Sequence, residues 1–119
     1  MRKSIFLAIA FVPLAACQTP EAGGARVGVR AINRMQVDSD QWWLEWADAG
    51  IVGGRDGCND WRYQAPGSPI VVSNAQECPA DAKRGAYWRI VSANRSVALR
   101  TIADRQLKVG SETLTLNAN

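Results

Sequence analysis

The chain has 119 residues, of which 14 are Lys or Arg, 11 are Asp or Glu and none is His, so its net charge is +3. Without histidine, serine–histidine and cysteine–histidine nucleophile systems are excluded, and the commonest general base of enzymes is absent. Arg2 and Lys3 lie in an N-terminal segment that we expect to be cleaved, as argued below. Without them, 12 basic residues remain against 11 acidic ones. A domain so close to neutrality gives no reason to expect nucleic-acid binding, which requires clustered basic residues.

The first 16 residues have the layout of a secretory signal peptide. Arg2 and Lys3 precede the apolar run Ile5–Val12, and small residues follow up to Ala16. A transmembrane anchor is the alternative, but the uncharged run is shorter than the roughly 20 apolar residues that a spanning helix needs. We therefore predict that residues 1–16 are a lipoprotein signal peptide that is removed.

The end of this segment, Leu14-Ala15-Ala16-Cys17, resembles a bacterial lipobox, in which the cysteine is lipidated and becomes the first mature residue. Several acyl chains of the palmitate type on Cys17 would exceed the two signals that stable membrane attachment requires. Gln18 follows the cysteine, which resembles an outer-membrane address in Gram-negative bacteria. We expect a lipid anchor in the cell envelope, in the outer membrane and facing the periplasm.

Two cysteines, Cys58 and Cys78, are left when Cys17 carries a lipid. In an oxidising compartment such an even pair favours a structural disulfide. A bond that closes a loop of about 20 residues would stabilise the fold by roughly 3 kcal/mol on the chain-entropy estimate. Free or redox-active thiols are one alternative. A metal site is another, although zinc wants four ligands and these cysteines do not form a C-x-x-C arrangement.

The mature chain has the length of one domain. Residues 17–25, beginning with the lipidated Cys17, have the Pro, Gly and small-residue composition of a flexible tether, and we expect a globular domain at 26–119. Alternating apolar residues predict a strand over 26–37, with an irregularity at Asn33. The same alternation predicts a strand over 42–46 that turns Trp42, Leu44 and Trp46 towards the core.

The middle of the chain changes its period. A short strand at 51–52 is expected to run into a glycine-rich turn, and a second strand at 70–72 follows a turn at Pro66-Gly67. Beyond Cys78 the apolar residues recur at helical spacing, which predicts a helix over 79–93 with Asp81 in its first turn. Gly85 is its weak point, because glycine disfavours helix interiors.

The last part of the chain alternates again. We expect a strand at 97–101 and then a hairpin that pairs 107–109 with 114–116 across a turn at Gly110-Ser111. The whole pattern predicts a single β-rich α+β domain, with a mostly antiparallel sheet or partly open barrel and one late helix.

Three short motifs carry a family resemblance: Gly57-Cys58-Asn59, Cys78-Pro79 before a helix, and a closing strand with Leu114-Thr115-Leu116. In this order, after an aromatic-rich strand, they resemble the META domain family, also called the heat-shock protein HslJ-like family. Many of its bacterial members are small envelope lipoproteins. The resemblance implies stress tolerance, drug resistance or virulence, with no catalytic residues to carry over and no cofactor.

The residues around Cys58 offer the chain's candidates for chemistry. Asp56 and Asp60 flank the cysteine, and a disulfide would bring Glu77 near them. Paired carboxylates could serve hydrolysis or bind calcium, although no calcium-loop spacing is present. The other interpretation is that Asp56 and Asp60 shape the turn through bonds to its backbone. Asn59 likewise fits a turn, beside Gly57, or a ligand contact.

The chain is also rich in tryptophan, with five in all. Alternation turns Trp43 away from the core face, and an exposed tryptophan is a candidate anchor for a protein or glycan partner. We give the same candidate binding role to Trp61. The alternative is that these rings cover the second face of the sheet or lie at the membrane interface.

Three hypotheses of function follow. The first is a non-enzymatic envelope lipoprotein of META/HslJ-like type that acts in interaction or in stress and antimicrobial tolerance, with the membrane and an unknown envelope protein or glycan as partners. The second is a periplasmic inhibitor or ligand-binding lipoprotein, similar to lysozyme inhibitors. The third is an enzyme that uses Asp56 or Asp60.

Overall fold

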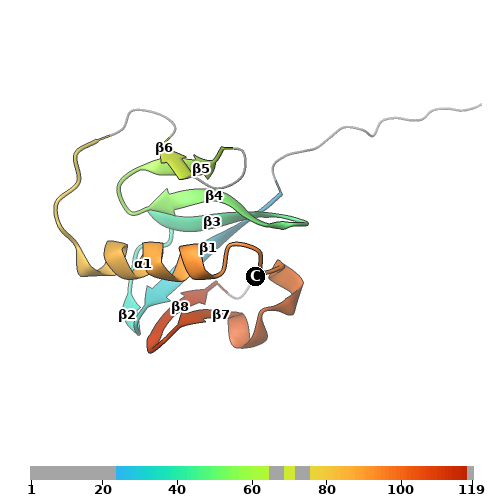
Figure 1. Ribbon diagram of the computed structural model, residues 1–119. Coiled ribbons are helices and arrows are strands. Elements are labelled where there is room, and N and C mark those ends of the chain that lie inside the picture. Colours follow the sequence, from blue (N-terminus) through green and yellow to red (C-terminus); the bar gives the residue numbers. More distant parts are fainter. Residues whose placement is uncertain (1–23, 65–68, 72–75, 118–119) are drawn as a thin grey trace, which may run out of the picture.

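An antiparallel sheet crossed by one helix forms the described part of the chain (Figure 1). The protein is represented by a computed structural model that describes residues 24–64, 69–71 and 76–117. The predicted β-rich α+β class, with one late helix, is confirmed. The strands are β1 Ala25–Ile32, β2 Met35–Gln36, β3 Trp42–Ala47, β4 Gly50–Asp56, β5 Asp60–Tyr63, β6 Pro69–Val71, β7 Gln106–Val109 and β8 Glu112–Leu116.

The sheet is open and runs in the order β6-β5-β4-β3-β1-β8-β7, with β2 paired to β1. Strand β1 is shared between two groups of strands, because its residues 25–28 pair with β3 and its residues 29–32 pair with β8. The register shifts between Val29 and Ala31, where β1 passes from one group to the other. In Figure 1, β3 to β6 lie above α1 and β7 and β8 lie below it, so a single strand joins the two halves.

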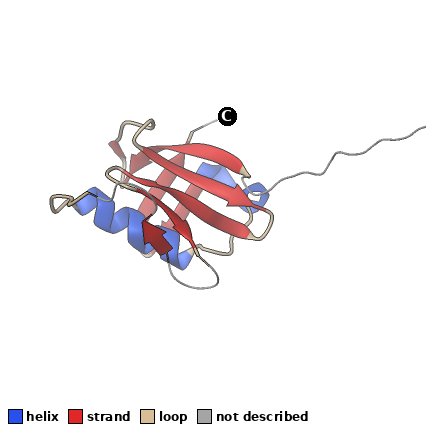
Figure 2. Ribbon diagram, turned by 90° about the horizontal axis from the view of Figure 1, so that it is seen from above, coloured by secondary structure: helices blue, strands red, loops and turns tan. Residues whose placement is uncertain are grey.

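The helix α1, Ala82–Ala93, lies along one face of the sheet (Figure 2). It begins at Ala82 and not at the expected Pro79, because Asp81 has extended backbone angles and acts as its N-cap. The Asp81 carboxylate accepts hydrogen bonds from the amides of Lys83, at 2.7 Å, and Arg84, at 3.4 Å. The buried face of the helix packs against strands of both halves and consists of Ala86, Tyr87, Ile90 and Val91.

The core confirms the predicted alternation in β3, since Trp42, Leu44 and Trp46 are all buried. Each occupies the face of the sheet that α1 covers, as a period of two requires. The indole nitrogen of Trp46 donates to the Val97 carbonyl at 2.9 Å, so its one polar atom is satisfied.

The centre of the core is Tyr87, whose side chain is fully buried. Its hydroxyl donates to the Trp43 carbonyl at 3.0 Å and accepts from the Trp61 indole nitrogen at 2.9 Å. Gly54 makes this contact possible, since a Cβ there would lie 2.6 Å from the Tyr87 hydroxyl and 2.4 Å from the Trp43 carbonyl oxygen. Burial raises the pKa of Tyr87 well above its ordinary value, so the hydroxyl stays protonated as a donor.

Several strand predictions need correction. The strand expected at 51–52 is longer, Gly50–Asp56, because its glycines also pair with the neighbouring strands. β5 lies so close that a Cβ at Gly53 would be 2.8 Å from the Trp61 carbonyl oxygen. The strand expected at 97–101 is wrong. The 3-10 turn η2 Leu99–Thr101 occupies the end of this range, and a second turn, η3 Ala103–Arg105, follows it. Of the alternating residues, Val97 and Leu99 are partly buried beside the core.

The first and last strands follow the sequence more closely. The irregularity expected at Asn33 is a turn between β1 and β2, in which Asn33 and Arg34 have φ of 50° and 69°. The hairpin at the end of the chain is confirmed as β7 and β8, joined at 110–111. β1 begins at Ala25, so the strand includes the last residue assigned to the tether.

The other predictions for the ends and loops fall outside the described residues. These include the signal peptide, Cys17, most of the tether and the Pro66-Gly67 turn. The strand expected at 70–72 is present as β6, and Val72 lies beyond the described part. Within the described ranges, α1 and the 3-10 turns are too short and too polar to span a bilayer.

We predict opposite effects of alanine at two glycines. Gly54→Ala should lower the free energy of unfolding by about 2–3 kcal/mol, because its methyl group displaces Tyr87 or the Trp43 carbonyl. Gly85→Ala is the matched control. Its Cβ would meet only the flexible end of Arg89, at 3.3 Å, and the better helix propensity should raise stability by about 0.5–1 kcal/mol.

Urea unfolding followed by tryptophan fluorescence measures both changes. Equal stability of the Gly54→Ala protein and the unchanged chain would show that the Tyr87 hydroxyl does not depend on this close approach.

Candidate functional site

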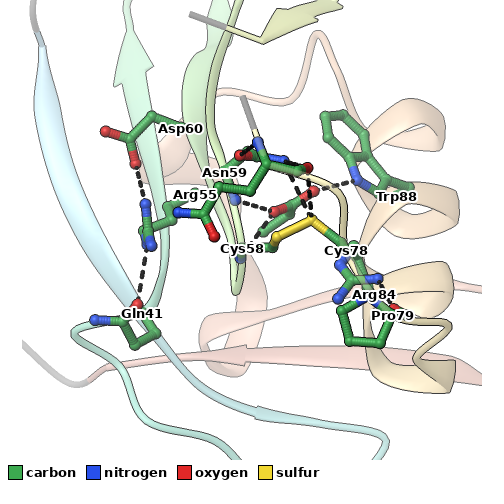
Figure 3. The surroundings of a disulfide bond; sticks show 11 residues. Gln41, Arg55, Cys58, Asn59, Asp60, Cys78, Pro79, Arg84 and Trp88 are labelled. Atoms are coloured by element: carbon green, nitrogen blue, oxygen red, sulfur yellow. Dashed lines mark hydrogen bonds and ion pairs between the residues drawn. A yellow bond between two sulfur atoms is a disulfide. The ribbon is translucent and has the colours of Figure 1, made fainter. Parts of the chain in front are cut away.

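The disulfide between Cys58 and Cys78 joins two loops (Figure 3). Cys58 lies in the turn between β4 and β5, and Cys78 lies in the segment that leads into α1. Their Cα atoms are 6.2 Å apart and 20 positions separate them in the chain. The predicted pairing is confirmed, in preference to free thiols or a shared metal. The bond ties the turn between β4 and β5 to the segment that precedes α1.

Asp56, at the end of β4, organises the turn that holds Cys58. Its Oδ1 accepts hydrogen bonds from the amides of Cys58, at 3.0 Å, and Asn59, at 2.8 Å. Its Oδ2 accepts from the indole nitrogen of Trp88 on α1 at 2.9 Å. The side chain is buried, with 6% exposed, and both oxygens are bonded. The turn-shaping interpretation of Asp56 is therefore confirmed, with a bond to the helix added.

Asn59 connects the turn to the second loop. Its Oδ1 accepts from the Gln76 amide at 2.8 Å, and its Nδ2 donates to the Gln76 carbonyl at 3.0 Å. The same Nδ2 lies 3.2 Å from the sulfur of Cys78. This side chain pairs with the backbone of Gln76 as a neighbouring strand would. Asn59 therefore has a structural role, as expected, but as a bridge between two loops and not through a left-handed backbone, which Gly57 adopts instead.

Gly57 supplies the conformation that the turn requires. Its φ is +87°, and a Cβ at this position would lie 2.4 Å from the ring of Trp42. Both the left-handed backbone and the close ring favour glycine here. The turn motif predicted around Cys58 is thus built by Asp56, Gly57 and Asn59 together.

Asp60 was also expected to shape the turn through bonds to the backbone, but its side chain forms an ion pair instead. Its Oδ1 lies 2.8 Å from Arg55 Nη1, and Arg55 Nε also donates to the Gln41 side chain at 3.1 Å. The ion pair is partly exposed and lies on the outer face of the sheet (Figure 3). Glu77 is exposed beside Cys78. Within the described ranges, no three Cys, Asp or Glu side chains cluster as metal ligands would.

The two tryptophans proposed as binding anchors differ. Trp43 is half-buried on the outer face of the sheet, and the guanidinium carbon of Arg26 lies 3.8 Å from its ring centroid. Trp61 is only 2% exposed and packs against Tyr63, Tyr87 and Trp88. The prediction of an exposed anchor at Trp61 is wrong, because its alternation in β5 turns it towards α1.

Sequence reasoning missed the partners that complete the site. Trp88 reaches Asp56 from 32 positions away, and Gln76 reaches Asn59 from 17. No periodicity links such positions, since the packing of α1 on the sheet brings Trp88 to Asp56, and the disulfide at Cys78 holds Gln76 beside Asn59. The one available signal was the helical spacing that put Tyr87 on the buried face, which places Trp88 beside it.

We predict that Asp56→Asn lowers the free energy of unfolding by about 2–3 kcal/mol. An amide can still accept from the turn, but its NH2 then faces the Trp88 donor, which is left unsatisfied. Asp60→Asn is the matched control and should cost less than about 1 kcal/mol, because its ion pair is partly exposed.

Urea unfolding measures both variants. Adding Trp88→Phe should reduce the cost of Asp56→Asn, since it removes the donor that faces the new amide. An Asp56→Asn protein of unchanged stability would contradict the structural role and would reopen a chemical one.

Comparison with known proteins adds no relative to this description. No family model, no curated protein and no solved structure matches the chain. The interpretation of the site therefore rests on its own geometry: two loops joined by a disulfide, with the Asp56 carboxylate bonded to the turn and to Trp88, and the Asn59 amide bonded to the second loop.

Proposed function

We propose that this protein is a non-enzymatic lipoprotein of the cell envelope, of META/HslJ-like type, that acts as an interaction or stress-tolerance module. The observation that carries the proposal is the bond between Cys58 and Cys78. A structural disulfide is typical of an oxidising compartment such as the periplasm. The bond also uses two of the three cysteines and leaves Cys17, directly behind Leu14-Ala15-Ala16, for lipidation.

We call residues 56–59, which the disulfide joins to Cys78, the stapled turn. Its geometry favours a structural role for these residues and not a catalytic one. The two carboxylates that could do chemistry have structural partners: Asp56 bonds the turn and Trp88, and Asp60 pairs with Arg55. A general base must have a lone pair directed at a substrate proton. Both oxygens of Asp56 instead accept bonds from the protein itself.

The outer face of the sheet is the proposed working surface. Neighbouring strands there present Trp43 opposite Arg55 and Glu45 opposite Arg26. Glu45 also accepts from Arg62 at 3.0 Å. This face combines one large ring with alternating charges, a composition suited to a protein or glycan partner because the ring supplies contact area and the charges supply specificity.

Intact mass of the protein purified from envelopes tests the anchor. Thiols are alkylated before reduction in one sample and after it in another. We expect loss of residues 1–16, added acyl chains on Cys17, and two alkylations that appear only after reduction. A mass without acyl chains would refute the anchor, and alkylation without reduction would refute the disulfide in the cell.

Complementation tests the working surface. In cells that lack the chain, Trp43→Ala should fail to restore tolerance to envelope stress, although its amount in the envelope is unchanged, because the ring is the largest apolar contact on that face. Met35→Ala is the control, since Met35 is 56% exposed but lies in β2. Full tolerance with Trp43→Ala would contradict this surface.

A further inference from the structure

A groove runs beside the first residues of β1, at the point where the tether would join the domain. It has a volume of about 590 Å3, and the turns η2 and η3 form its opposite wall. A second hollow of about 420 Å3 adjoins it and shares Ala25, Leu99 and Arg100 with it. The two hollows therefore flank the start of the strand on which the anchor would pull.

The floor of the larger hollow is apolar. Val27 and Leu116 are buried members of the core, and Leu99 and Ile102 pack against that core while staying partly exposed. Partly exposed Leu and Ile side chains in a concavity offer contact to a hydrocarbon group. The floor thus suits a ligand with an apolar part.

The rim of the larger hollow is cationic. Arg100 and Arg105 line it against the single carboxylate of Asp104, whereas the guanidinium of Arg26 lies over Trp43 on the outer face of the sheet. Arg100 and Arg105 are exposed, and Arg105 Nη1 donates to the Asn117 carbonyl at 3.3 Å. Arginine binds phosphate through paired N–H groups, so this rim is complementary to a phosphate anion. In the smaller hollow Asp48 balances Arg100.

The short segment between Cys17 and the domain limits the distance between this groove and the membrane. Only the residues from Cys17 to Gly24 separate the expected acyl chains from the hollow that Gly24 lines. Fully extended, such a segment spans at most about 25 Å. If Cys17 is acylated, the groove is held within that distance of the lipid headgroups.

We propose that this groove binds the phosphate headgroups of anionic phospholipids in the membrane that anchors the chain, with the upper part of an acyl chain over its apolar floor. The proposal rests on the lipid anchor of the proposed function. It adds a second, electrostatic contact that orients the domain, with the start of β1 and the turns η2 and η3 towards the bilayer.

The test uses the acylated protein from envelopes, placed in nanodiscs of phosphatidylcholine alone or with added phosphatidylglycerol. Hydrogen exchange of the amides in 98–105 is the readout. We expect anionic lipid to slow this exchange about fivefold, the factor one arginine gains near an anionic surface, and high salt to restore it. Arg100→Gln with Arg105→Gln should abolish the slowing, whereas Arg30→Gln with Lys108→Gln, the same charge change outside the groove, should keep it.

Each other outcome overturns the proposal. Equal exchange in both lipids would refute the groove and leave the anchor standing, because the protein would still be in the discs. Equal loss in both double variants would show attraction by overall charge alone. Slowing by inorganic phosphate added to phosphatidylcholine discs would assign the groove to a soluble anion. Failure to enter either disc would refute the anchor, and the groove proposal with it.

Discussion

The carboxylate of Asp56 is the interaction on which the rest of the structure depends, because it joins the end of β4 and the turn that follows to α1, 32 positions further along the chain. It closes the turn that carries Cys58, it ends β4, and it fixes Trp88 on α1. Trp88 in turn packs on Trp61, with ring centroids 4.7 Å apart. A buried carboxyl group needs such partners, since polar atoms without hydrogen bonds in the core cost free energy. The helix is therefore located by a polar bond as well as by apolar area.

The disulfide and the Tyr87 hydroxyl extend the same connection in two directions. The disulfide fixes the segment before α1 against the turn, so the helix is held at its start, and Tyr87 holds its middle against β3 and β5. These bonds act on one short region of the sheet, where Gly54 lets the helix approach closely. Loss of one of them should therefore weaken the others, since contacts within a network are not independent.

The sequence predicts those features that local patterns encode. Alternation identified the buried side of β3 and the final hairpin, and the cysteine count identified the disulfide. Prediction from the sequence failed where a long-range contact overrides the local pattern. Residues 97–101 alternate as a strand would, but they form a 3-10 turn beside the core. Trp61 looked like a surface anchor because nothing local reveals that α1 covers it. The bond from Asp56 to Trp88 is of the same kind.

The register of β3 separates the turn that carries Cys58 from the groove beside the start of β1. Trp42, at one end of the strand, pairs with Asp56 of the stapled turn, whereas Trp46, near the other end, pairs with Ala25 beside the groove. At about 3.4 Å per residue, these positions lie well over 10 Å apart. An anchor at Cys17 pulls on the Ala25 end, so the groove would face the membrane and the stapled turn would point away from it. With the proposed anchor, the disulfide would stiffen the end of the domain that faces away from the membrane, and a rigid surface there would bind a partner at a low cost in entropy.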